Sequence, residues 1–120
     1  MFKRLITTIA IAFICLYGFS QDNYYTQKAE SYMREAEYYT KKAEGHDREA
    51  EYYNKKAQGY MREAEYYSRK NNKDKARTYS KWASDAMDKA RMQMRWANDA
   101  RDKAKSYMQQ AGNNLHKVNR

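Results

Sequence analysis

The chain after residue 20 lacks nearly all of the residues that build an ordinary hydrophobic core. It contains no phenylalanine, isoleucine, proline or cysteine, and its only leucine and valine are Leu115 and Val118. The absence of cysteine excludes disulfide bonds from this region. A shortage of aliphatic side chains combined with many charges is also typical of disordered chains, so disorder is the alternative to any folded interpretation.

Alanine and tyrosine, by contrast, are abundant and regularly spaced, which a disordered chain does not require. From Ala29 to Ala64 an alanine recurs every seven residues, and an aromatic ring follows each alanine by three residues. This repeat indicates the seam of a coiled coil, with alanine at heptad position a and the ring at position d. After an interruption the alanine repeat resumes at Ala76 and continues to Ala111.

The interruption predicts where the chain reverses. Twelve residues separate Ala64 from Ala76, a spacing that a continuous coiled coil does not readily accommodate. Asn71 and Asn72 lie between them and favour a turn, and we expect Asn71 and Asp74 to cap the following helix. The sequence therefore predicts an all-α fold, in which two long antiparallel helices form an alanine-rich coiled-coil hairpin.

The reversal also predicts which residues face each other across the seam. Position a of one antiparallel helix faces position d of the other, and here the facing residues have numbers that add to about 143. Each layer then contains at least one alanine, so the helices can approach closely, as in the packing type called an Alacoil. The predicted seam residues are Ala36, Tyr39, Ala43, His46, Ala50, Tyr53, Ala57, Tyr60, Ala64, Tyr67, Ala76, Tyr79, Ala83, Ala86, Ala90, Ala97, Ala100, Ala104 and Tyr107.

The first twenty residues have the layout of a secretory signal peptide. Lys3 and Arg4 precede an apolar run, and the small residues Gly18 and Ser20 follow it. We expect export to the periplasm, the outer envelope or the cell exterior after cleavage. An uncleaved membrane anchor is the alternative, although the run is shorter than the roughly 20 apolar residues that span a bilayer. The predicted segments are a signal peptide (1–20), a first helix with 14-residue repeats (21–70), a turn (71–74), a second such helix (75–112) and a frayed tail (113–120).

Large apolar side chains also fall at heptad positions outside the seam, where a two-helix hairpin cannot bury them all. Exposed apolar surface of this kind predicts self-association or docking on another surface. Partial cover along the helices is the alternative, because methionine and tyrosine tolerate it. The candidate assembly residues are Tyr38, Tyr52, Tyr66, Trp82, Trp96, Met61, Met87, Met94 and Met108.

Positive charge is concentrated in the second half of the chain. Residues 21–70 contain ten basic and ten acidic residues, whereas residues 71–120 contain twelve basic and five acidic residues. This imbalance predicts contact with an anionic polymer or a membrane surface. A solvated helix face is the alternative. The candidate anion-binding residues are Lys73, Lys75, Arg77, Lys81, Lys89, Arg91, Arg95, Arg101, Lys103 and Lys105.

No residue pattern indicates catalysis. The sequence has no glycine-rich phosphate loop and no Ser-His-Asp arrangement, and its only histidines are His46 and His116. We therefore expect no catalytic residues, no metal, no cofactor and no small-molecule substrate. Because His46 occupies a seam position, its protonation is expected to weaken helix pairing.

Two functional hypotheses follow. The first is an exported, non-enzymatic structural or assembly protein, whose helical hairpins associate as a homo-oligomer. The alternative is a secreted binding module, whose basic helix face contacts an acidic glycan, extracellular nucleic acid or the cell-envelope surface.

Overall fold

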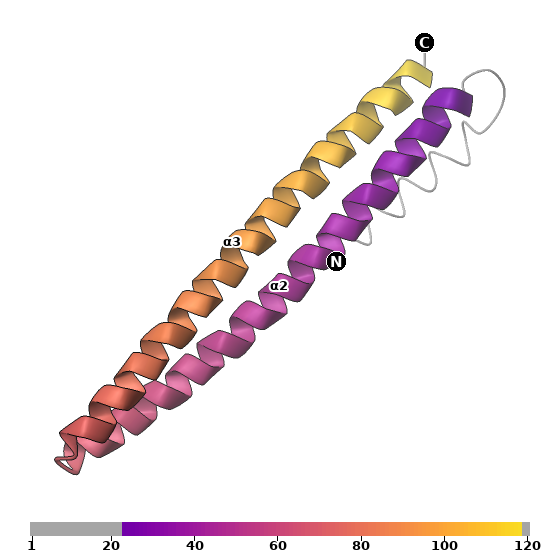
Figure 1. Ribbon diagram of the computed structural model, residues 1–120. Helices are drawn as coiled ribbons and strands as arrows, with labels where there is room; N and C mark the ends of the chain where they lie inside the picture. Colours follow the sequence, from indigo (N-terminus) through magenta and orange to yellow (C-terminus); the bar gives the residue numbers. More distant parts are fainter. Residues whose placement is uncertain (1–22, 119–120) are drawn as a thin grey trace. The chain divides into compact units, whose positions relative to one another are not determined.

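Two long helices make up the part of the chain that the computed structural model describes, residues 23–118. Helix α2 spans Asn23–Arg69 and helix α3 spans Lys73–Val118, and they pack as a hairpin (Figure 1). This confirms the predicted all-α antiparallel fold. The predicted signal peptide lies outside the described residues. Over the described range, neither helix has a stretch apolar enough to cross a membrane.

The turn between the helices is closed by its two asparagines. Asn71 adopts a left-handed backbone conformation with φ of 59°. Its amide donates to the carbonyl of Ser68 at 3.1 Å, and the amide of Asn72 donates to the carbonyl of Tyr67 at 2.9 Å. These two bonds form a Schellman motif, which satisfies the last carbonyls of α2. The turn is therefore built from local backbone bonds at the position that the sequence predicted.

The cap of α3 differs from the prediction, because Asn72 and not Asn71 provides it. The Asn72 Oδ1 atom accepts a hydrogen bond from the backbone amide of Lys75 at 3.2 Å. Asn71 cannot serve as the cap, since it occupies the left-handed position that ends α2. The residue three positions after the cap is consequently Lys75, so the expected pairing of Asn71 with Asp74 in a capping box is wrong.

Removal of this cap is expected to destabilise the hairpin measurably. Asn72→Ala leaves the Lys75 amide without its side-chain acceptor and should lower the free energy of unfolding by about 1 kcal/mol. Urea denaturation followed by circular dichroism measures the change. Asn72→Ser, which retains a capping oxygen, is the matched control and should lose less than half as much. Equal losses in the two variants would contradict this role for the side chain.

The chain divides into two compact units. One contains Glu44–Asn98, which includes the turn, and the other contains residues 23–43 and 99–118. In each unit the core is the alanine seam, whose alanines are at most 7% exposed except beside the turn, where Ala64 and Ala76 are half-buried. The buried alanines are Ala50, Ala57, Ala83, Ala86, Ala90 and Ala97 in the first unit, and Ala29, Ala36, Ala43, Ala100, Ala104 and Ala111 in the second.

Stacked tyrosines set the register within each unit. In the Glu44–Asn98 unit, the Tyr79 ring lies between Tyr60 and Tyr67, with centroid distances of 6.2 and 5.5 Å. The residue of α2 midway between Tyr60 and Tyr67 is Ala64. It is also the residue predicted to face Tyr79, because facing residues have numbers that add to about 143. The observed contacts therefore match the predicted register.

The second unit repeats this arrangement. Its Tyr107 ring lies between Tyr32 and Tyr39, with centroid distances of 6.1 and 5.7 Å. The residue midway is Ala36, again the predicted facing residue. The rings can stack in this way because the residue facing each of them is an alanine, whose methyl group leaves space for the ring.

One position of the repeat is polar. His46 and Gln93 occupy places where the corresponding residues elsewhere in the repeat are tyrosines, and the His46 Nδ1 atom lies 2.7 Å from Gln93 Oε1. The ring also tilts against Trp96, with centroids 5.6 Å apart. The Nδ1 atom donates to this amide oxygen when the ring carries its proton there. The weakening of helix pairing on protonation of His46 stays a prediction.

The end of α3 lies beyond the predicted boundary. The helix continues through Gly112 to Val118, although the sequence predicted an end at residue 112 and a frayed tail. The reason is that Asn114 and Val118, each 8% exposed, continue the seam spacing, and Asn114 Nδ2 donates to the carbonyl of Gln110 at 2.8 Å. The helix also begins two residues earlier than predicted, at Lys73.

Candidate anion-binding site

Eight lysines lie beside the seam at heptad position g, the residue immediately before position a. In an antiparallel coiled coil, the g positions of both helices lie on the same side of the seam. The lysines of each helix recur every fourteen residues, so each helix contributes one to every repeat. They are Lys28, Lys42, Lys56 and Lys70 of α2, and Lys75, Lys89, Lys103 and Lys117 of α3.

Each pair of these lysines is associated with two adjacent tyrosines of α2. The two rings meet edge to face, with centroids 5.1 to 5.3 Å apart and interplanar angles of 69° to 80°. We call each set of four residues a lysine–tyrosine cluster. The clusters are Tyr24, Tyr25, Lys28 and Lys117; Tyr38, Tyr39, Lys42 and Lys103; Tyr52, Tyr53, Lys56 and Lys89; and Tyr66, Tyr67, Lys70 and Lys75.

The tyrosine rings hold the ammonium groups in place. The α3 lysine of each cluster lies over the second tyrosine, at 5.0 to 5.6 Å from the ring centroid. The α2 lysine lies over one of the two rings, at 5.4 to 5.9 Å. Cation–π contacts of this length stabilise by about 0.5–1 kcal/mol at exposed sites. The rings therefore restrain two cations from opposite helices without neutralising their charge.

Carboxylates do not neutralise these lysines. Within residues 23–118, none of the eight cluster lysines forms an ion pair. Other basic residues of α2 behave differently, since Lys41 and Lys55 pair with Glu37 and Glu51 at 3.3 and 3.2 Å. The cluster lysines thus lie on the g side of the hairpin without an ion pair, whereas the paired Lys41 and Lys55 lie at position f on its outer face.

The ammonium of Lys28 is held in its charged form by its neighbour. A hydrogen bond with the Tyr24 side chain, together with the electrostatic effect of that ring, raises the pKa of Lys28 above its usual value. The shift keeps this ammonium charged to a higher pH than an ordinary lysine.

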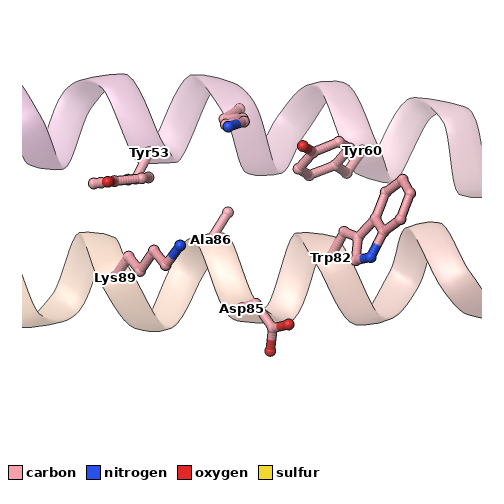
Figure 2. Close-up of a pocket in the computed structure, with 7 residues that line it drawn as sticks. Tyr53, Tyr60, Trp82, Asp85, Ala86 and Lys89 are labelled. Atoms are coloured by element: carbon pink, nitrogen blue, oxygen red, sulfur yellow. The ribbon is translucent and has the colours of Figure 1, made fainter.

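A hollow of about 240 Å³ opens beside the third cluster, within the Glu44–Asn98 unit (Figure 2). Ala86 lies between Tyr53 and Tyr60 in this view, the Lys89 side chain extends toward Ala86, and Trp82 rises toward Tyr60. The lining residues are Tyr53, Lys56, Tyr60, Trp82, Asp85, Ala86 and Lys89.

Asp85 is the acidic residue that lines the hollow. Its carboxylate is directed away from α2 (Figure 2), and no ion pair with Lys56 or Lys89 occurs among the described residues. The hollow therefore combines aromatic walls with two cations and one carboxylate at its edge. Such a set of groups can hold a ring that carries a negative charge and hydroxyl groups.

The ten basic residues predicted to bind anions are all exposed, but the structure does not gather them on one face. Lys75, Lys89 and Lys103 lie in the clusters described above. The other seven occupy three further heptad positions of α3 and so point to different sides of the helix. One of these, Arg91, is bound to Asp88 at 3.0 Å.

The candidate assembly residues are mostly exposed. Tyr38, Tyr52 and Tyr66 are 51–58% exposed, and Trp82 and Trp96 are 45–46% exposed. Among the methionines, Met61 and Met94 are exposed, whereas Met87 and Met108 are half-buried. Met92, which the sequence did not single out, is also exposed.

Five cluster lysines were missed by reasoning from the sequence. They belong mainly to the first half of the chain, whose equal numbers of acidic and basic residues suggested no binding face. A signal was nevertheless present, because lysine occupies every second position g of both helices, from Lys28 to Lys70 and from Lys75 to Lys117. The missed residues are Lys28, Lys42, Lys56, Lys70 and Lys117.

No grouping of three histidine, cysteine or acidic side chains that could hold a metal ion occurs within residues 23–118. Comparison with known proteins adds no further constraint on function. No family model, no curated protein and no solved structure matches this chain.

Proposed function

We propose that this protein is a non-enzymatic binding module that holds a linear polyanion along its lysine–tyrosine clusters. The observation that carries the proposal is the pairing of lysines from opposite helices over tyrosine rings, with no carboxylate partner among the described residues. Cations restrained in this way lose little conformational entropy when an anion binds, which favours affinity. The expected signal peptide would place this activity outside the cytoplasm.

The spacing of the clusters suits a repeating ligand. Successive clusters on α2 are fourteen residues apart, which corresponds to roughly 21 Å within each unit at 1.5 Å per residue. Glu35, Glu49 and Glu63 occupy the intervening g positions of α2. The face therefore presents separate anion sites and not a continuous basic strip, and a polymer that carries regularly spaced anionic groups can occupy several of them together.

Substitution of cluster lysines tests the proposal against a closely matched control. Lys42→Gln with Lys56→Gln removes one cation from each of two clusters, and each lost contact should weaken polyanion binding about tenfold. Lys41→Gln with Lys55→Gln removes the same net charge one residue away, from lysines already paired with glutamates. This control should weaken binding less than about threefold.

Isothermal titration calorimetry with heparin and with inorganic polyphosphate, at two salt concentrations, measures both variants. A steep loss of affinity with salt is expected, since binding releases counterions. Equal effects of the two double substitutions would show that net charge alone is responsible. Absence of binding by the unaltered protein to every polyanion would remove the proposal altogether.

Self-association is the second candidate, and the exposed aromatic and methionine residues favour it. A second copy of the chain would carry the same fourteen-residue repeat and match this spacing. Gly45 and Gly59 alternate with the exposed tyrosines Tyr38, Tyr52 and Tyr66 in the sequence. The gaps at these glycines are where a second copy would insert bulky side chains.

Gly59→Ala separates the two candidates. A Cβ atom at Gly59 meets nothing within 4 Å, so the substitution should raise the free energy of unfolding by up to about 1 kcal/mol. Thermal unfolding gives the stability, and sedimentation velocity gives the mass. A single protomer in solution, stabilised by the substitution, would favour the binding module. An oligomer that dissociates on Gly59→Ala would favour assembly through these gaps.

A further inference from the structure

The hollow beside the third cluster lies one heptad away from a layer in which a tyrosine ring is stacked. Tyr79, one heptad before Ala86, stacks between Tyr60 and Tyr67. Ala86 takes the equivalent position between Tyr53 and Tyr60 but ends at its Cβ atom, and the space that a ring would fill stays open as the hollow of about 240 Å³. A ring at position 86 would therefore occupy the place in the heptad that Tyr79 holds seven residues earlier.

We infer that this hollow binds one uronic acid unit of an acidic polysaccharide, an assignment that rests on the proposed function and names its ligand. A sugar ring would lie between the Tyr53 and Tyr60 rings, as Tyr79 lies between Tyr60 and Tyr67. Its carboxylate would be held between the ammoniums of Lys56 and Lys89, both of which line the hollow. A volume of this size is smaller than that of a drug-sized pocket and suits a single ring.

The remaining lining residues are compatible with a sugar ring. Asp85 lines the edge of the hollow with its carboxylate directed away from α2, so a sugar hydroxyl group that reaches this edge can donate a hydrogen bond to it. Trp82, in edge-to-face contact with Tyr60 at 5.6 Å, closes one end of the hollow with an indole ring, against which a sugar face can pack.

Ala86→Tyr is the decisive substitution because it fills the hollow without disturbing the fold. The introduced ring would stack as Tyr79 does, so thermal stability should be maintained or rise. Affinity for oligogalacturonate should fall at least tenfold, while affinity for inorganic polyphosphate, which uses the clusters generally, should change less than threefold. Lys81→Gln, on the same helix but outside the hollow, is the charge control.

Fluorescence provides a direct reading of occupancy. The chain has two tryptophans, so a Trp96→Phe background leaves Trp82 as the sole reporter. Titration with oligogalacturonate should change its emission, and the same titration after Ala86→Tyr should not. Unchanged affinity of the Ala86→Tyr protein for oligogalacturonate would overturn the inference.

Three further outcomes separate this inference from the proposed function. Tighter binding of oligothymidylate than of oligogalacturonate would overturn the ligand class, while the function as a polyanion-binding module would stand. A ligand-free dimer that becomes monomeric on Ala86→Tyr would assign the hollow to a second copy and overturn the inference. A protein that binds none of the three polyanions would refute the function and the inference together.

Discussion

Tyr79→Ala is expected to lower the free energy of unfolding by about 3 kcal/mol, a large effect for one half-buried side chain. The Tyr79 ring contacts three others, since it lies parallel to Tyr67 at 5.5 Å, beside Tyr60 at 6.2 Å and edge-on to Trp82 at 5.2 Å. Because alanine layers bury little apolar area, these rings supply much of the contact between the helices. Their loss cannot be offset by neighbouring aliphatic side chains, which this part of the chain lacks.

Thermal unfolding measures the effect, with a decrease in Tm of roughly 10–20 °C for a domain of this size. Tyr66→Ala is the control, because this tyrosine of α2, adjacent to Tyr67 in the sequence, is 51% exposed. It should lose less than about 1 kcal/mol. Similar losses from the two substitutions would mean that the stack does not hold the helices together.

The paired substitution His46→Tyr with Gln93→Tyr is expected to stabilise the Glu44–Asn98 unit by about 2 kcal/mol. These residues interrupt a series of tyrosine stacks, and a polar hydrogen bond of 2.7 Å joins them instead. A ring at position 93 would lie between the ring at position 46 and Tyr53, as Tyr107 lies between Tyr32 and Tyr39. A neutral hydrogen bond contributes only about 1 kcal/mol net, so the added stack should outweigh its loss.

Urea denaturation of the double variant and both single variants forms a double-mutant cycle. Gln93→Tyr alone should change stability little, since it adds one ring but leaves His46 without its amide partner. The two substitutions together should therefore exceed the sum of the single effects by about 1 kcal/mol. A double variant no more stable than the unaltered protein would indicate that the polar pair is already the better solution at this layer.

Much of the fold could be predicted because its determinants are local. The seven-residue spacing of alanine and tyrosine predicts helices and their buried face without reference to any distant residue. The paired asparagines predict the turn, although which of them caps α3 depended on the left-handed conformation of Asn71. The end of α3 was placed too early, because Gly112 and Asn113 resemble a helix end while Asn114 and Val118 continue the buried spacing.

The candidate site was harder to predict from the sequence than the fold. The count of charges along the chain predicted an anion-binding face on α3 alone. Seven of the ten basic residues predicted to form that face lie outside the clusters. Each cluster instead joins a lysine of α3 with a lysine and two tyrosines of the electrically balanced α2. Lys56 and Lys89, for example, are far apart in the sequence and meet only because of the helix register.

The sequence by itself determined the helices, the turn and the alanine seam, because heptad spacing and asparagine turn chemistry act over a few neighbouring residues. Only the tertiary structure decided where the cations gather and where the hollow opens. Both depend on which residue of α3 lies opposite which residue of α2, and stacking of Tyr79 and Tyr107 between rings of α2 selects that pairing. With this register, Ala86 falls between Tyr53 and Tyr60, and the missing ring leaves a site beside two lysines.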